Sequence, residues 1–587
     1  MSRFVLPFFV ALVGLTPAVA APVPAGPDAK PPTDLPVPAE TMVVVHLNGI
    51  DRTRERLSKM LTGVGADFAK QTAKQLDDVL KSALEGRDLK AIDGTGRVYL
   101  AVGHLTQLSG PDAAVAVCLP VADYKAFRQK FLTAGERRSS EIGKDGVDTF
   151  TTADTDQTVH LVNKDGYVTV TPNKALAEQY AGKFDRLSVK ALAKSADALL
   201  GSDVSVFVNL TQVNALYAAE IAQGKQLFNL ILQQGAQGLD KQQLETTKTM
   251  FEAIFQMVED GRGLVLGIDL RPEGVALRVD ARFAPDTATG KLVAAERPTV
   301  LAALGEMPKG MMSYTATKWK LNLGKLSREF VAAPDEEKSA DAIAALEKML
   351  TDGGTDSVSV SADMRTSLTL RTVAGADKAT AALLKVLKGL TAGSSYSNVL
   401  LKGRPDVTEK AETHKGFTLH RAELKMDFEA TAEKMPNEEQ RAAAVASMKR
   451  LSPEKVTQWF GSDGKRLVTV VAPDWKAAKG LLDAVLDKTA TAASDARFAA
   501  TRKQLPPTAG TVMLFDAVKS LAFVGGFLEG MKLALPDLPV ELPKFDQVTG
   551  DPVYLGVAVG LSGDTARVDA FVPVGVVKLV RQVFAGK

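Results

Sequence analysis

Residues 264–283 read Leu-Val-Leu-Gly-Ile-Asp-Leu-Arg-Pro-Glu-Gly-Val-Ala-Leu-Arg-Val-Asp-Ala-Arg-Phe, and a close copy of this stretch returns near the C-terminus. Seven residues of the copy match without a gap, each 289 positions later (for Gly556 and Gly267, 556 minus 267). In both places apolar residues alternate on either side of a turn that contains Gly274 or Gly563. Glycine readily adopts the positive φ that tight hairpin turns require. We therefore predict two β-hairpins and an internally duplicated chain.

The segments around the two hairpins are predicted to follow the same order. Residues 41–47 form a β-branched apolar run that predicts a strand buried on both faces. Pro308 precedes Met312 as Pro38 precedes Met42, and both pairs introduce a predicted strand. Each half is expected to run strand, helix, hairpin, helix, strands, strand, helices, hairpin. This order predicts an α+β fold of two tandem domains, with largely antiparallel sheets covered on one face by amphipathic helices.

The length of 587 residues is enough for two to four domains of roughly 100–200 residues each. Proline and glycine clusters mark the expected boundaries. The expected segments are a signal peptide at 1–20, a proline-rich unpacked leader at 21–38, a first α+β copy at 39–285, a boundary at 286–306 and a second copy at 307–587.

The first twenty residues are typical of a secretory signal. Arg3 precedes an apolar core at 4–15, and Ala18-Val19-Ala20 fits a cleavage site. This pattern predicts export to the periplasm or the extracellular space, with a mature chain that is soluble. The alternative is a retained N-terminal anchor, although the apolar core is shorter than the roughly 20 residues that a membrane-spanning helix needs.

The balance of charge argues against nucleic acid as a partner. Lys and Arg number 71 and Asp and Glu number 69, so the chain has almost no net charge with which to attract a polyanion. A protein partner or an apolar ligand remains possible. Cys118 is the only cysteine, so a disulfide within the chain is impossible, and its apolar neighbours favour a buried small hydrophobe over a reactive thiol.

No motif predicts a catalytic residue, a metal site or a cofactor. The five histidines are not spaced as ligand pairs, and no phosphate-binding loop or G-x-S-x-G motif occurs. Ser452-Pro453-Glu454-Lys455 fits S-x-x-K, but it fits the start of a helix better, and its partner motifs are absent. His46 shares a predicted strand face with Met42 and Val44. We interpret it as a hydrogen-bonded core histidine, with a catalytic base as the alternative.

Two pairs of charged residues recur in both copies, namely Arg278 with Asp280 and Arg567 with Asp569. Residues two apart on a strand share a face, so each pair predicts a solvated ion pair. The alternative is a ligand-binding face that was duplicated with the fold. These four residues are the candidate binding residues of the sequence.

An export signal, a proline-rich leader and tandem modules that each begin with a strand after a proline resemble the layout of uncharacterised secreted bacterial proteins with domains of unknown function. The resemblance implies no active site. We interpret the chain as a non-catalytic exported binding or structural protein. One alternative is a carrier of an apolar ligand such as a lipid, held between the long helices and a sheet. The other is a hydrolase whose polar residues assemble only in three dimensions.

Overall fold

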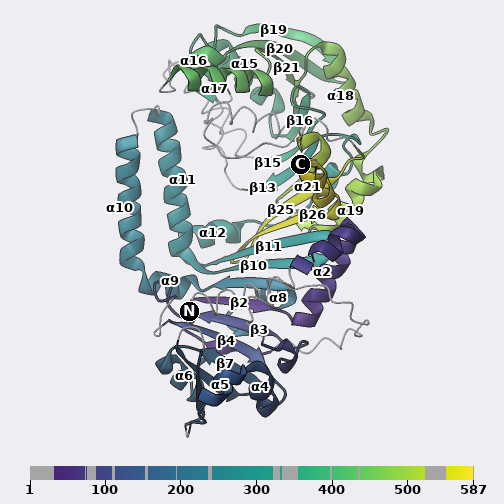
Figure 1. Cartoon of the computed structure of the whole chain (residues 1–587). Helices are drawn as coiled ribbons and strands as arrows, with labels where there is room; N and C mark the ends of the chain where they lie inside the picture. The colour runs from purple at the N-terminus through teal and green to yellow at the C-terminus, as the bar shows by residue number, and fades with distance from the viewer. Residues whose placement is uncertain are drawn as a thin grey trace. The chain divides into compact units, whose positions relative to one another are not determined.

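The fold is α+β and is described by a computed structural model (Figure 1). The structure describes residues 32–72, 74–75, 87–108, 113–143, 145–152, 156–192, 195–235, 241–320, 331–332, 355–396, 399–433, 437–521 and 550–585. The predicted export signal and the first part of the leader lie outside these residues.

The chain divides into two compact units. Unit 1 comprises Met1–Leu227, Ala253–Gly290 and Asp564–Val568, and unit 2 comprises Phe228–Glu252, Lys291–Gly563 and Asp569–Lys587. The division after Gly290 falls inside the expected boundary at 286–306. That boundary is more than a linker, because it contains helix α12 (Ala288–Ala295).

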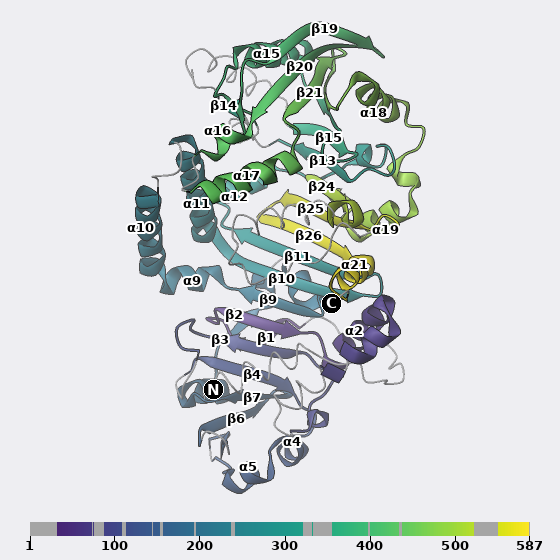
Figure 2. The ribbon, with the colours of Figure 1, turned by 45° about the horizontal axis from the view of Figure 1, so that its top comes forward.

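Unit 1 is built on an antiparallel sheet with the strand order β5–β6–β7–β4–β3–β2–β9–β10–β11. Figures 1 and 2 show helices α4 and α5 at the end of this unit where β6 and β7 lie. The strands are β2 (Val43–Leu47), β3 (Val98–Val102), β4 (Val115–Pro120), β5 (Val147–Thr151), β6 (Thr158–Lys164), β7 (Tyr167–Thr171), β9 (Val204–Val208), β10 (Gly261–Arg271) and β11 (Gly274–Phe283). The helices are α2 (Ile50–Val64), α4 (Tyr124–Phe131), α5 (Ala134–Ser139), α6 (Lys174–Ala181), α7 (Val189–Leu192), α8 (Ser195–Gly201) and α9 (Leu210–Leu216), with a 3₁₀ turn η1 (Leu89–Ala91).

Both faces of the unit 1 sheet are buried in its central strands. Leu100 on β3 belongs to a core with Phe127 and Phe131 of α4. The next residue, Ala101, belongs to a second core with Tyr180 of α6. Successive residues of a strand point to opposite faces, so helices must cover both sides. The prediction of one covered face is therefore wrong for these strands, while the prediction that β2 is buried on both faces is confirmed.

The folded part of the chain also begins earlier than expected. Residues Asp34–Pro38 form strand β1, which pairs with β8 (Arg186–Ser188). Leu35 and Val37 are fully buried in the second core. The expectation of an unpacked leader up to residue 38 is thus wrong at its end. The alternation of proline with apolar residues suits an outlying strand, where a missing backbone donor is tolerated.

Unit 2 is built on an antiparallel sheet with the strand order β19–β20–β21–β22–β16–β15–β13–β24–β25. Its strands are β13 (Ser313–Trp319), β15 (Thr355–Ser361), β16 (Ser367–Thr372), β19 (Asp406–His414), β20 (Phe417–Asp427), β21 (Lys455–Ser462), β22 (Arg466–Val471), β24 (Thr511–Asp516) and β25 (Tyr554–Ser562), with short strands β12 (Thr299–Val300), β14 (Val331–Ala332), β17 (Ser395–Tyr396), β18 (Val399–Leu401) and β23 (Thr508–Ala509). Its helices are α15 (Ala376–Gly389), α16 (Phe428–Ala432), α17 (Glu438–Leu451), α18 (Trp475–Asp487), α19 (Ala496–Gln504) and α21 (Val574–Ala585), with 3₁₀ turns η3 (Ala302–Leu304) and η5 (Ala492–Ser494). Strand β26 (Thr565–Pro573) and helices α10 (Ala218–Gly235) and α11 (Lys241–Asp260) each contribute residues to both units.

The strands of unit 2 pair in the order found in unit 1. In unit 1 the paired neighbours follow the order β10, β9, β2, β3, β4, β7, β6, β5. In unit 2 they follow the order β25, β24, β13, β15, β16, β22, β21, β20. When the strands of each list are ranked by their position in the chain, the two orders are the same. Equivalent backbone contacts recur as well. The Asn209 N–H donates to the carbonyl of Met42 at 2.7 Å, and the Asp516 N–H donates to that of Met312 at 2.8 Å. Met42 and Met312, which follow the two matched prolines, therefore occupy the same place in their sheets.

The hairpin that the sequence predicts at residues 264–283 is confirmed. Strands β10 and β11 pair antiparallel from Gly261 to Phe283. Gly274 and Gly563 have φ values of 157° and 65°. Both values are positive, which explains why glycine stands at each position.

Helices α10 and α11 leave apolar side chains in solvent. On α10, Leu230 and Ile231 are 48% and 55% exposed. In the part of the chain that the structure describes, no helix combines the length and the apolar character needed to cross a bilayer.

Candidate functional site

Helix α4 carries two different faces, one for the core and one for the candidate site. Asp123 caps its N-terminus by accepting the N–H of Ala126 at 3.1 Å, a standard way to satisfy a free amide at a helix start. Phe127 and Phe131 lie one turn apart, stack at 4.6 Å and are buried. Tyr124 starts the helix, and Arg128 lies four residues later, so these two side chains share a different face.

Helix α5 is short and is fixed at its start by a capping box. The Thr133 side chain accepts the N–H of Glu136, and the Glu136 carboxylate accepts the N–H of Thr133. Glu136 also forms an ion pair with Arg87 in which each side chain is only 1% exposed. Arg87 in turn lies over the ring of Phe131, 6.0 Å from its centre. This buried pair ties α5 to the end of α4.

A cavity of about 670 Å³ opens between α4, α5, the segment after α5 and strand β5. Its size lies within the range of roughly 300–1,000 Å³ that is usual for small-molecule sites. We call it the α4–α5 pocket. It is lined by Tyr124, Lys125, Arg128, Gln129, Leu132, Arg137, Ser140, Ile142, Gly143, Gly146, Asp148 and Asn163.

The inner wall of the α4–α5 pocket is a hydrogen-bonded network centred on Asp148. The Asp148 carboxylate accepts the hydroxyl of Tyr124 at 2.7 Å and the N–H of Gly143 at 3.1 Å, and it forms an ion pair with Nη1 of Arg128 at 3.3 Å. Nη2 of Arg128 donates to Oγ of Ser140 at 2.9 Å. Burial, reinforced by the bond to Asp148, raises the pKa of Tyr124 above its ordinary value, so the phenol remains a donor. The network holds its side chains in fixed positions.

Arg137 has a different role in the same pocket. Its Nη1 donates to the carbonyl of Gln129 at 2.6 Å and to the carbonyl of Leu132, both at the C-terminal end of α4. Carbonyls at a helix end have no partner within the helix, so the guanidinium satisfies them. The charge of Arg128 is balanced by Asp148, whereas no carboxylate of the described residues lies within ion-pair distance of Arg137.

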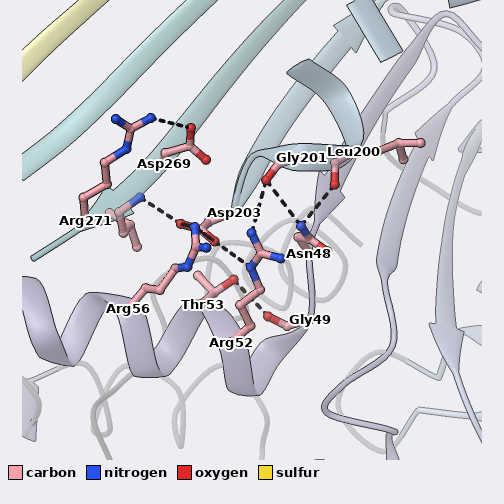
Figure 3. Close-up of polar contacts among 11 residues, drawn as sticks. Asn48, Gly49, Arg52, Thr53, Arg56, Leu200, Gly201, Asp203, Asp269 and Arg271 are labelled. Atoms are coloured by element: carbon pink, nitrogen blue, oxygen red, sulfur yellow. Dashed lines mark hydrogen bonds and ion pairs between the residues drawn. The ribbon is translucent and has the colours of Figure 1, made fainter. Parts of the chain in front are cut away.

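A second polar cluster in unit 1 surrounds Asp203 (Figure 3). Its side chain is fully buried, and it accepts Nε of Arg52 at 3.2 Å and Nη1 of Arg56 at 3.1 Å, both from α2. The N–H of Leu270 on β10 donates to it at 2.8 Å. Asn48 donates to the carbonyl of Leu200 at 3.1 Å. The cluster joins α2 to β9 and β10, so we assign it a structural role.

The sequence-derived candidates occupy ordinary sheet positions. Arg278 forms two parallel hydrogen bonds with Asp280, Nε to Oδ1 at 3.1 Å and Nη2 to Oδ2 at 2.6 Å. The ion pair expected there is present, although the Asp280 side chain is fully buried and not solvated. Arg567 and Asp569 lie half-buried on β26. The α4–α5 pocket is lined by none of these four residues.

Two predictions about single residues are confirmed. His46 is fully buried, with Nδ1 3.1 Å from Oγ of Ser205, and Ser205 in turn donates to the carbonyl of Leu199 at 2.5 Å. Because the serine proton is used there, Nδ1 must carry the donor of the His46 bond. Cys118 is also fully buried, and burial raises its pKa to about 11, which makes it an unreactive thiol.

Sequence reasoning missed the α4–α5 pocket, although part of its signal was available. A helix was expected after the first hairpin, and the four-residue spacing of Tyr124 and Arg128 places both on one face of it. Asp148 lies two residues before Phe150 on β5, so both share one strand face, and this places a polar group beside an apolar one. The sequence contains no sign that these two segments meet.

Comparison of the chain with protein-family models, with curated proteins and with solved structures finds no match. Among the described residues, no group of three or more His, Cys, Asp or Glu side chains is arranged to hold a metal ion. The functional argument therefore rests on the chain's own residues.

Proposed function

We propose that this chain is a non-catalytic, exported binding protein and that the α4–α5 pocket is its ligand site. The observation that carries the proposal is a cavity of about 670 Å³ whose polar wall is already in place. Tyr124, Arg128 and Ser140 are held by the hydrogen bonds around Asp148. A site with fixed donors loses little conformational entropy when a ligand binds, which favours affinity.

The same bonds support binding over catalysis. The Ser140 hydroxyl accepts from Arg128 and donates to the carbonyl of Arg137 at 3.0 Å, so it is oriented as a structural group and not toward a general base. The Asp148 carboxylate accepts hydrogen bonds from Tyr124 and Gly143 and pairs with Arg128, so it is held as the structural anion of the network.

The proposal is tested with a variant that fills the mouth of the pocket. Gln129 lines the pocket and is exposed, and its carbonyl, not its side chain, binds Arg137. Gln129→Trp should therefore block the site and leave these bonds intact. Lys130→Trp is the matched control, because Lys130 is the next exposed residue of α4 and lies outside the lining.

The measurement is a thermal-shift screen against small anions, cations, sugars and lipids. We expect compounds that raise the melting temperature of the wild type and of Lys130→Trp and that leave Gln129→Trp unchanged. A screen without any compound of this behaviour would contradict the proposed function.

We further propose that the two units arose by duplication and that the N-terminal segment directs export. The shared strand order and the equivalent contacts of Met42 and Met312 support the first point. An experimental structure of residues 21–587 should show that the two sheets superpose. N-terminal sequencing of the exported chain should begin at Ala21, and recovery of intact Met1 in membranes would instead support an anchor. The layout that resembles uncharacterised secreted bacterial proteins fits this proposal.

The second candidate is a carrier of an apolar ligand. It is favoured by the exposure of Leu230 and Ile231 on α10, at 48% and 55%. Exposed apolar side chains grouped on one helix often mark a contact with a lipid or a protein. Native mass spectrometry of the exported chain tests it, since copurified lipid is expected and a lipid-free spectrum would exclude it.

A further inference from the structure

Arg137 and Lys125 are the cations of the α4–α5 pocket that have no carboxylate within ion-pair distance among the described residues. Three cationic side chains, Lys125, Arg128 and Arg137, line the pocket with one carboxylate, Asp148. Arg128 and Asp148 neutralise each other through their contact at 3.3 Å. The pocket therefore has an excess of positive charge, which favours an anion by electrostatic complementarity.

The guanidinium of Arg137 is oriented before any ligand arrives. Nη1 is fixed on the carbonyls of Gln129 and Leu132. Among the described residues, neither Nε nor Nη2 of Arg137 has a hydrogen-bond partner. These two atoms form the edge with which an arginine holds a carboxylate through two parallel bonds. Arg278 uses this edge on Asp280 in the same chain.

Part of the pocket wall is apolar. Ile142 is 77% exposed and Tyr124 is half-buried, and both line the pocket with Arg137. An aliphatic or aromatic body that covers this wall would remove apolar surface from water, at roughly 25 cal/mol for each Å².

We propose that the ligand of this pocket is a small organic anion, whose carboxylate or phosphate binds the Nε and Nη2 edge of Arg137 while its apolar body packs on Ile142 and Tyr124. The inference rests on the proposed function of the α4–α5 pocket, and it adds the chemical class of the ligand. Carboxylate and phosphate share the oxygen geometry that matches a guanidinium, so the experiment must separate them.

Isothermal titration calorimetry with three probes of similar size tests the inference. Benzoate and phenyl phosphate carry the two anionic groups, and benzamide is the neutral counterpart. We expect benzoate or phenyl phosphate to bind the full mature chain at least about tenfold more tightly than benzamide, since hydrogen bonds to charged groups contribute more than neutral ones. Tighter binding of benzoate identifies a carboxylate site, and tighter binding of phenyl phosphate identifies a phosphate site.

Variants of neighbouring arginines provide the matched comparison. Arg137→Gln should lower the affinity for the tighter-binding anion by at least about tenfold. Arg138→Gln should change this affinity by less than about twofold, because Arg138 is exposed and lies outside the pocket lining. Arg137→Lys keeps the positive charge but cannot form two parallel hydrogen bonds. Its loss of affinity for the anion should therefore lie between those of the other two variants. If Arg137→Gln fails to fold, two other measurements test the inference. These are the anion affinity of Arg137→Lys and the relative affinity of the wild type for benzoate and benzamide.

Equal affinity for benzoate and benzamide, no binding of either anion, or an Arg137→Gln variant with wild-type affinity would overturn the inference. The proposed function fails separately. A neutral compound whose thermal shift is abolished by Gln129→Trp would keep the α4–α5 pocket as the binding site and would exclude an anionic ligand.

Discussion

Replacement of Glu136 by glutamine should destabilise unit 1 more than any ordinary surface change. Glu136 pairs with Arg87, and each side chain is only 1% exposed. Glutamine has the same shape and also completes a capping box, so the bond to Thr133 can persist. The variant therefore removes a buried negative charge and little else.

The size of the destabilisation follows from the loss of one charge of a buried ion pair. Breaking a buried ion pair by removing one partner costs about 3–5 kcal/mol, because a buried charge loses a contact that offsets its desolvation. Glu136→Ala also loses the cap, which adds about 1 kcal/mol. Arg87→Met combined with Glu136→Leu removes both charges and keeps apolar bulk, so it should recover most of the loss.

The assay must report on unit 1. Trp319, Trp459 and Trp475 are the tryptophans of the chain, and all three belong to unit 2. Tryptophan fluorescence would therefore follow unit 2. Hydrogen exchange in peptides from β4 to β7, read by mass spectrometry, gives the opening free energy of unit 1 directly. A Glu136→Gln variant whose opening free energy lies within about 1 kcal/mol of the wild type would refute the assignment of a buried, charged pair.

Three further perturbations have defined outcomes. Asp203→Asn should lower the opening free energy of β9 by about 1–3 kcal/mol, because the amide no longer balances two arginines, and an unchanged exchange rate would contradict this. Burial lowers the pKa of His46 to about 3, so between about pH 6.5 and pH 3 the unfolded state binds the extra proton and stability falls by about 1.4 kcal/mol for each unit of acidification. The His46→Gln variant should lack this slope in hydrogen exchange. The hydrogen bond from Lys479 lowers the pKa of Asp483, so its stabilisation is present above about pH 4 and is lost below it. Asp483→Asn should flatten the acid limb of unfolding followed by fluorescence of the nearby Trp475, and parallel acid limbs would contradict the assignment.

Local patterns were enough to predict the class of fold and the hairpin at residues 264–283. Alternating apolar residues and a glycine with positive φ act within a few positions of each other, so the sequence contains their full cause. The burial of Leu35 and Val37 was not predictable in this way. It depends on pairing with β8, about 150 residues later. The neighbouring prolines predicted an unpacked segment, but the pairing with β8 and the burial of Leu35 and Val37 place it in the folded part of the chain.

The candidate site shows the same division between local and distant causes. The shared helix face of Tyr124 and Arg128 follows from their spacing. The anchoring of Arg137 does not, because its partners are the backbone carbonyls of Gln129 and Leu132, which every residue possesses. When a charged side chain binds main-chain carbonyls, the identities of the partner residues do not indicate the contact, so the sequence does not predict it.

The proposed duplication has a consequence for where ligands bind. Helix α4 follows β4 in unit 1 as α15 follows β16 in unit 2, and the turn at Asn163 corresponds to the turn at Ser462. Asn163 lines the α4–α5 pocket, whereas the Ser462 hydroxyl donates to Asp377 in the first turn of α15. A polar contact thus joins helix and turn at the place where unit 1 has its pocket. If the two units arose by duplication, as proposed, the ligand site belongs to unit 1, because in unit 2 the equivalent turn and helix are joined by this hydrogen bond.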